Sequence, residues 1–134
     1  MPDVFPAKTR SYIMSRIRSR WTLQERTIHS YLKGWRIRHT MHPKVPGSPD
    51  ILVRSRLAVF IHGCFWHGCP RCYVPPKSRQ AYWHLKIRRN RRRDRKSLGA
   101  ARRAGFCVLR IWEHEFRASP KASANKIAAS VDDG

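Results

Sequence analysis

A scarce carboxylate and two nearby histidines are the residues in this sequence best suited to chemistry. The chain has only 8 Asp and Glu residues, and Asp50 follows a proline at the start of an apolar run. His62 follows the next apolar run, and His67 comes shortly after it. A carboxylate can hold Mg²⁺ against a phosphate oxygen, and an imidazole can accept or donate a proton near neutral pH. The three together predict a phosphodiesterase site. Asp50 alone would be more typical of a turn or strand edge, and each histidine alone of a zinc ligand or a packed side chain.

Three of the four cysteines lie close together, at Cys64, Cys69 and Cys72. A C-x2-C pair can present two thiolates to one zinc ion, and Cys64 can supply a third. Four residues could provide the fourth ligand: His114, Cys107, His62 or His67. We favour His114, which we expect in a loop after an apolar strand, whereas Cys107 alternates within that strand and is expected to be buried. The alternative is a disulfide, which a reducing intracellular compartment disfavours. A zinc ion with four protein ligands is structural rather than catalytic.

Two large aromatic side chains, Phe65 and Trp66, lie between the first two of these cysteines. A segment rich in Gly, Cys and His offers them no regular core to fill. Aromatic wedges can separate stacked base pairs, and a mismatched step resists such separation less than a paired one. The residues alone leave two functions open, a wedge into DNA or a cover over the metal site.

The composition limits the classes of partner. The 134 residues include 29 Lys and Arg against 8 Asp and Glu, a formal charge of +21. Such a charge attracts polyanions, so we expect a nucleic-acid partner. The apolar runs are far shorter than the ~20 residues of a membrane span, and no secretory signal pattern opens the chain. We therefore expect an intracellular protein that binds nucleic acid and has no membrane contact. A ribosomal or chromatin-type protein without catalysis would have a similar composition.

The elements that must position these residues can be predicted from the sequence pattern. Thr22 and Glu25 form a capping box before an amphipathic helix that ends at Gly34. Three strands follow, at residues 35–40, 51–53 and 57–61. A basic helix, a fourth strand and a last helix complete the order, at residues 78–104, 106–112 and 119–131. This order predicts an α/β fold with a mixed sheet flanked by helices, in a single domain over 1–134 that has a basic arm at 1–20.

Several strings extend over nearly the whole chain and together are highly specific. The longest is HGCFWHGCPRC at residues 62–72. The others include Arg10-Ser11, Met14-Ser15, Pro46-Gly47-x-Pro49-Asp50, Tyr82-Trp83, Lys86-Ile87, Asn90, Arg93-Asp94-Arg95 and Trp112-Glu113. This set resembles the very short patch repair (Vsr) DNA mismatch endonucleases of bacteria, which nick DNA beside T·G mismatches.

The resemblance implies a role for individual residues. Asp50 corresponds to the Mg²⁺-binding carboxylate, and the backbone carbonyl of Ile61 lies where the family adds a second metal contact. His62 and His67 correspond to the catalytic imidazoles, with His67 favoured for activating water, and Glu25 to an acidic residue near the active site. The implied structural zinc ligands are Cys64, Cys69, Cys72 and His114. The implied DNA-binding residues are Phe65, Trp66, Trp83, Met14, Lys86 and Asn90.

The resemblance also implies a restriction-endonuclease-like core. We therefore expect a monomeric, Mg²⁺-dependent endonuclease that nicks one strand of double-stranded DNA beside a T·G mismatch, with other repair proteins as candidate partners. Two alternatives stay open at this point. One is a zinc-stabilised nucleic-acid-binding protein without catalysis, and the other is a nuclease for another mismatch or lesion.

Overall fold

The computed structural model describes residues 21–132. The expected basic arm at 1–20, which includes Met14, lies outside the described residues. The helices and strands follow in the order α2 (Leu23–Gly34), β1 (His39–Met41), β2 (Ile51–Val53), β3 (Leu57–His62), α3 (Gln80–Arg103), β4 (Cys107–Trp112), α4 (Glu113–Ala118) and α5 (Pro120–Asp132).

The four described strands form one mixed sheet in the order β1-β2-β3-β4. The β1–β2 and β2–β3 pairs are antiparallel, and β3 and β4 are parallel. The β2–β3 hairpin turns through Arg54 and Ser55, whose φ angles of 52° and 54° are the positive values that tight hairpin turns require. The predicted mixed α/β class is confirmed, and the first three strands pair in chain order as an antiparallel meander. The likeness to restriction endonucleases stays a prediction.

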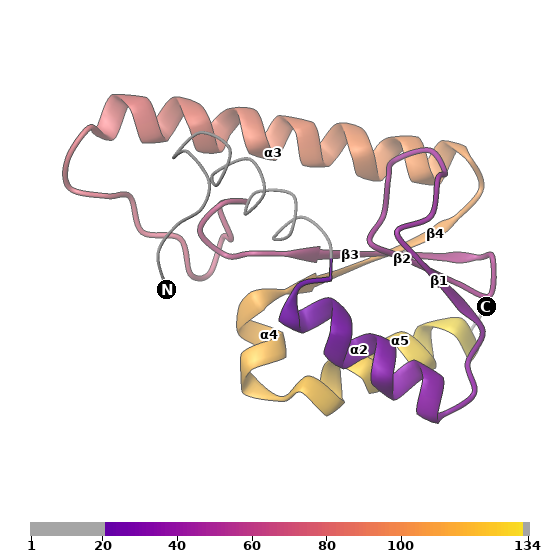
Figure 1. Ribbon diagram of the computed structural model, residues 1–134. Helices are drawn as coiled ribbons and strands as arrows, with labels where there is room; N and C mark the ends of the chain where they lie inside the picture. Colours follow the sequence, from indigo (N-terminus) through magenta and orange to yellow (C-terminus); the bar gives the residue numbers. More distant parts are fainter. Residues whose placement is uncertain (1–20, 133–134) are drawn as a thin grey trace, which may run out of the picture.

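Helices cover both faces of this sheet, with α3 along one face and α2 and α5 on the other (Figure 1). Alternate residues of β3 point to opposite faces. Leu57 and Val59 join the core shared with α2 and α5, while Ala58 and Phe60 pack with α3. His62 continues the second series, so its side chain faces α3. This alternation determines which helix meets the histidine at the end of β3.

The helix over Leu23–Gly34 begins as the sequence predicts. Thr22 and Glu25 form the reciprocal capping box, in which each side chain accepts a hydrogen bond from the other residue's backbone N–H. The strand predicted at 35–40 is wrong at its start, because Trp35 caps the helix and Arg36 has a φ of 59°. The backbone N–H of Ile37 still bonds the carbonyl of Leu32 in the last helical turn. The chain is therefore free to pair as a strand only from His39 onward.

Two predictions around β4 are also wrong. Cys107 is exposed rather than buried, because it is the first residue of an edge strand that pairs only with β3. His114 lies on the short helix α4 rather than in a loop. Glu115 caps that helix by accepting the backbone N–H of Trp112 at 2.9 Å. With a single buried residue, Phe116, the helix has too little apolar periodicity to be recognised from the sequence.

Candidate active site

Asp50 is fixed between β2 and β3 by both its backbone and its side chain. Its backbone N–H bonds the carbonyl of Val59 at 2.9 Å, which continues the β2–β3 pairing. Its Oδ2 accepts the backbone N–H of Ile61 at 2.6 Å. The preceding loop packs on α3 at Gly47, where a Cβ would lie 2.4 Å from the carbonyl oxygen of Ser97. The predicted metal residues Asp50 and Ile61 therefore meet at the end of β3.

The electrostatic environment of Asp50 favours a cation. Burial and the charge of Glu25 raise the pKa of Asp50 to about 6, although the hydrogen bond from Ile61 acts in the opposite direction. A buried carboxylate with a raised pKa is stabilised in its charged form by a nearby positive charge. Asp50 and a backbone carbonyl are hard oxygen ligands, so this donor set fits Mg²⁺.

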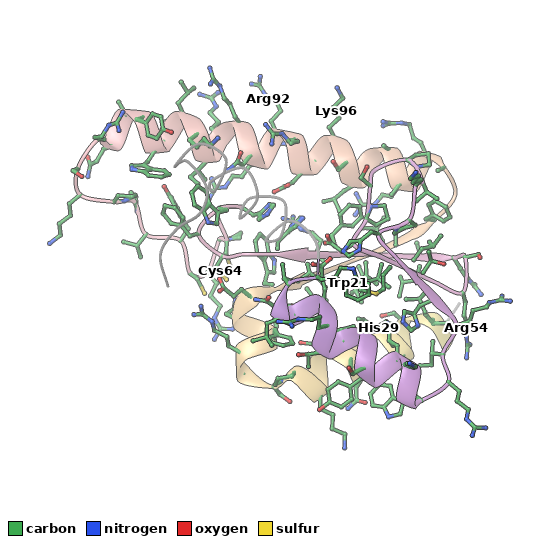
Figure 2. The ribbon with its side chains drawn as sticks, viewed as in Figure 1. Trp21, His29, Arg54, Cys64, Arg92 and Lys96 are labelled. Atoms are coloured by element: carbon green, nitrogen blue, oxygen red, sulfur yellow. The ribbon has the colours of Figure 1, made fainter. Side chains whose placement is uncertain are left out.

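Glu25 lies near Asp50 but has other hydrogen-bond partners. Glu25 is buried, with 2% of the residue exposed. One carboxylate oxygen accepts the backbone N–H of Thr22, and the other bonds Nε2 of His42. Trp21 packs edge-on against the rings of His42 and His29; Trp21 and His29 are labelled in Figure 2. Glu25 thus acts on Asp50 through its charge while it holds the start of α2 against the loop that leads to Asp50.

His62 is buried at the end of β3 and has a defined hydrogen-bonding state. Its Nδ1 lies 3.0 Å and 3.3 Å from Nη2 and Nε of Arg110. A guanidinium can only donate hydrogen bonds, so Nδ1 of His62 must accept and Nε2 carries the proton. Burial, His67 and Arg110 lower the pKa of His62 to about 3. His62 is therefore a neutral imidazole with an N–H at Nε2.

His67 lies against His62 and is oriented by Asp94. The two imidazole rings stack with centroids 4.0 Å apart and an interplanar angle of 9°. Nδ1 of His67 lies 2.7 Å from Oδ2 of Asp94, a residue of α3. This contact assigns the proton to Nδ1 and leaves a lone pair on Nε2, which bonds no group among residues 21–132. The arrangement is that of a histidine base oriented by a buried carboxylate.

The sequence prediction gave no role to Asp94 or Arg110. Asp94 is 8% exposed and shares the buried face of α3 with Ile87, Leu98 and Ala101. The sequence did contain a signal for Asp94. It is a single acidic residue within a run of Arg and Lys, and its helical spacing places it on the same face as the apolar residues. Arg110 interrupts an apolar strand, which was a second signal.

His62, His67 and Asp94 have ligand atoms close enough together to surround a metal ion. The guanidinium of Arg110 bonds one of these imidazoles, and its positive charge opposes a second cation there. The contact between His67 and Asp94 also uses donor atoms that a metal would need. The three residues are therefore better suited to proton transfer than to metal binding.

The four predicted zinc ligands come together as a second cluster. The ligand atoms of Cys64, Cys69, Cys72 and His114 all lie within 4.8 Å of one another. Nδ1 of His114 is 3.4 Å from the sulfur of Cys64 and 3.6 Å from that of Cys69. In tetrahedral zinc, the standard bond lengths place sulfur and nitrogen about 3.6 Å apart. A Cys₃His set at these spacings can hold a metal ion, and its ligand types and these two distances fit zinc.

This cluster also fixes the segment that carries His67. The backbone N–H of Cys69 bonds the carbonyl of Cys64 at 2.8 Å, and the N–H of His67 bonds that of Gly63 at 3.2 Å. Gly68 follows with a φ of 60°, and a Cβ there would lie 2.4 Å from Nε of Arg91. The tight turn between the candidate metal ligands Cys64 and Cys69 therefore places His67 over His62.

The predicted aromatic residues form one cluster at the tip of this turn. Phe65 packs against Trp66 and Trp83 with ring centroids 5.2 Å and 5.3 Å away. Trp66 is 52% exposed, so the cluster presents an aromatic surface rather than a closed core. Nδ2 of Asn90 donates to the carbonyl oxygen of Trp66 at 2.8 Å. Asn90, a predicted DNA-binding residue, thus supports the aromatic turn, and Lys86 lies on the same helix between Trp83 and Asn90.

No helix of the described residues is long and apolar enough to cross a membrane.

Comparison with known proteins finds that the family described as DNA mismatch endonuclease Vsr matches residues 2–73. The type II nicking enzyme V.XorIIP of Xanthomonas oryzae pv. oryzae is 41% identical over 119 residues, which cover 86% of this chain and 87% of that protein. The type II nicking enzyme V.NmeAIP of Neisseria meningitidis is 34% identical over 99% of both chains. The DNA mismatch endonuclease Vsr of Escherichia coli is 33% identical over 137 residues, 99% of this chain and 87% of that one.

Proposed function

Because the chain belongs to the DNA mismatch endonuclease Vsr family and is thereby a DNA endonuclease, we propose that it nicks one strand of duplex DNA beside a T·G mismatch by Mg²⁺-dependent hydrolysis. The observation that carries the proposal is the His67–Asp94 contact beside the Asp50 carboxylate, in a chain with few acids. A protein that only bound phosphate would gain nothing from buried carboxylates at its binding face. This observation favours the endonuclease over the non-catalytic alternative.

Asp50 would hold the metal through its carboxylate, with the backbone carbonyl of Ile61 as a second ligand. The hydrogen bond from the Ile61 N–H fixes the orientation of that carboxylate before any metal binds. Bound Mg²⁺ would polarise a phosphate oxygen and offset the charge that develops during hydrolysis. Glu25 supports this site by holding His42 and the start of α2, and its charge adds to the preference for a cation.

His67 would act as the general base that removes a proton from the attacking water. Asp94 keeps the proton of His67 on Nδ1, so the lone pair of Nε2 is ready to accept a proton. The same carboxylate stabilises the imidazolium that forms when His67 takes the proton.

His62 would act as a neutral hydrogen-bond donor rather than as a second base. With Nδ1 occupied by Arg110 and its pKa lowered to about 3, His62 offers an N–H from Nε2 to an oxygen of the reacting phosphate. The stacked rings cannot both carry a positive charge without mutual repulsion. A neutral His62 therefore permits His67 to become protonated.

The structural part of the site would consist of a zinc ion and an aromatic wedge. Zinc held by the Cys₃His cluster would keep the turn over residues 64–69 rigid. Phe65, Trp66 and Trp83 would then enter the base stack beside the mismatch, because Trp66 is exposed, its backbone carbonyl is held by Asn90, and the half-buried Phe65 and Trp83 pack against it.

A cleavage panel tests this function. Duplexes of one sequence with each of the mismatches, and the fully paired duplex, would be incubated with the enzyme in the presence and absence of Mg²⁺. We expect one nick, in the strand with the mismatched T, only in the T·G duplex and only with Mg²⁺. Nicking of a different mismatch would replace the T·G assignment, and intact duplexes throughout would contradict the endonuclease.

A further inference from the structure

A small cavity lies beside His67, on the side of the site where α3 meets β4. Its volume is about 180 Å³, and its lining includes three arginines, Arg91, Arg95 and Arg110, together with Pro70 and Trp112. No described residue contributes a carboxylate to that lining. The mechanism proposed above uses only Arg110 among the three, through its bond to His62.

Two of these guanidinium groups are held in place by contacts that leave other N–H groups unused. Arg91 donates from Nε and Nη2 to the carbonyl oxygen of Gly68 at 3.1 Å and 2.8 Å. Arg110 lies over the ring of Trp112, with Cζ 4.4 Å from the ring centroid, and bonds Nδ1 of His62. Each guanidinium carries five N–H donors, so both retain donors for a further acceptor.

The positive charge of this cavity is only partly offset by acidic groups among residues 21–132. The Asp94 carboxylate and the Cys69 thiol favour the charged form of Arg110, but Oδ2 of Asp94 already bonds His67. Burial opposes the charged form of Arg110, and three guanidinium groups in one small cavity repel one another. A bound anion would offset both costs and would accept the remaining N–H donors.

The size of the cavity restricts the class of anion. At roughly 30 Å³ per water molecule in the liquid, 180 Å³ corresponds to about six waters. Sites for drug-sized ligands are larger, about 300–1,000 Å³. A tetrahedral oxyanion fits this space.

We propose that the arginine cavity formed by Arg91, Arg95 and Arg110 binds one phosphate group beside the catalytic His67. The phosphate comes either from the DNA backbone next to the cleaved bond or from free inorganic phosphate. The DNA source rests on the proposed function, whereas binding of inorganic phosphate does not. Because both sources share one chemistry, the experiment has one arm for each.

The matched variants are R95Q and R92Q. Both remove one positive charge from neighbouring turns of α3, but Arg95 lines the cavity while Arg92 points away from the sheet (Figure 2). Both side chains are exposed, so neither change should impair folding, and thermal unfolding checks this. R91Q is a second cavity variant that should behave like R95Q.

In the first arm, inorganic phosphate is titrated into the full-length, DNA-free protein by calorimetry, without Mg²⁺ and at constant ionic strength. Loss of one charge-assisted contact should weaken phosphate binding about tenfold in R95Q, while R92Q should stay within about twofold of the wild type. This arm does not depend on nicking, so it decides the cavity even if the proposed function fails.

In the second arm, binding to a T·G duplex is measured without Mg²⁺ over a range of salt concentrations. If the cavity holds a backbone phosphate, R95Q should reduce the magnitude of the salt slope by about 0.9 more than R92Q does. If R95Q weakens phosphate binding more than R92Q does in the first arm, the cavity is a site for free phosphate. If R95Q lowers the salt slope more than R92Q does in the second arm, the cavity contacts a phosphate of the DNA backbone. If R95Q matches R92Q in both arms, the proposal is overturned.

Discussion

Nδ1 of His67 lies 2.7 Å from Oδ2 of Asp94, and this contact joins the turn between Cys64 and Cys69 to the buried face of α3. It orients the imidazole, assigns its proton and leaves Nε2 as the acceptor. The ring also stacks on His62, which is held in the opposite tautomer by Arg110. The two adjacent imidazoles thus carry their protons on different ring nitrogens, because Nδ1 of His67 faces a carboxylate and Nδ1 of His62 faces a guanidinium.

The first prediction concerns the Asp94 carboxylate. D94N keeps the shape of the side chain but removes the charge that orients and stabilises His67. We expect the single-turnover rate on a T·G duplex to fall by about 10²–10⁴-fold, the usual contribution of a general base. DNA affinity should change little. The control is R93Q on the same helix, whose exposed side chain has no part in the contact and whose rate should be nearly normal. An unchanged rate in D94N would contradict the role of His67 as a base.

The second prediction concerns the metal held by the cysteines. Purified protein should contain one zinc ion per chain, and C69S should lose it, whereas C107S should retain it because Cys107 lies outside the cluster. A structural zinc contributes on the order of 10 kcal/mol to folding, so chelation should unfold or strongly destabilise the protein. Metal analysis and thermal unfolding test this. Equal metal content in C69S and C107S would contradict the site.

The third prediction concerns the exposed aromatic surface. W66A should weaken binding to a T·G duplex by about 1–3 kcal/mol, the range measured for loss of one base–aromatic stack. Binding to paired DNA should be less affected, because no opened step is available there. W35A is the control, since Trp35 is also partly exposed but lies at the end of α2. Equal losses on paired and mismatched duplexes would argue that Trp66 has no part in recognising the mismatch.

The fourth prediction concerns the pH dependence of stability through His29. Partial burial, His39 and Lys33 lower the pKa of His29, whose Nδ1 lies 2.8 Å from Nε2 of His39. The unfolded chain therefore takes up the proton first, near the usual pKa of about 6.5. The contribution of neutral His29 is complete above that pH and is lost as the pH falls below it. Urea unfolding between pH 7.5 and 5 should show a smaller decline in H29Q than in the wild type. The control H84Q, at an exposed position of α3, should decline like the wild type, and an unchanged decline in H29Q would contradict the assignment.

Features set by neighbouring residues could be predicted from the sequence. The capping box of Thr22 and Glu25 and the β2–β3 hairpin depend on contacts within a few residues. The short spacing of Cys64, Cys69 and Cys72 likewise indicated a metal site before the structure placed them together. Asp50 was recognisable as a strand-start carboxylate, although its bond to Ile61 was not.

Features set by the tertiary structure could not be predicted. Asp94 reaches His67 only because α3 crosses the sheet above the end of β3, and Arg110 reaches His62 only because β4 pairs with β3 in parallel. Neither partner is near its histidine in the chain. The prediction of a strand from residue 35 was wrong for a local reason instead. The backbone hydrogen bonds of Trp35 and Ile37 to the last turn of α2 compete with strand formation.

The central claim is that Asp50 enables Mg²⁺-dependent nicking at a T·G mismatch. The most direct test compares wild type and D50N on one T·G duplex, with nicking and binding measured in parallel. We predict that D50N loses nicking by at least about 10³-fold, consistent with loss of several kcal/mol of metal-derived transition-state stabilisation, and binds the duplex as tightly as the wild type. Nicking by D50N at the wild-type rate, or by the wild type without a divalent metal, would contradict the account.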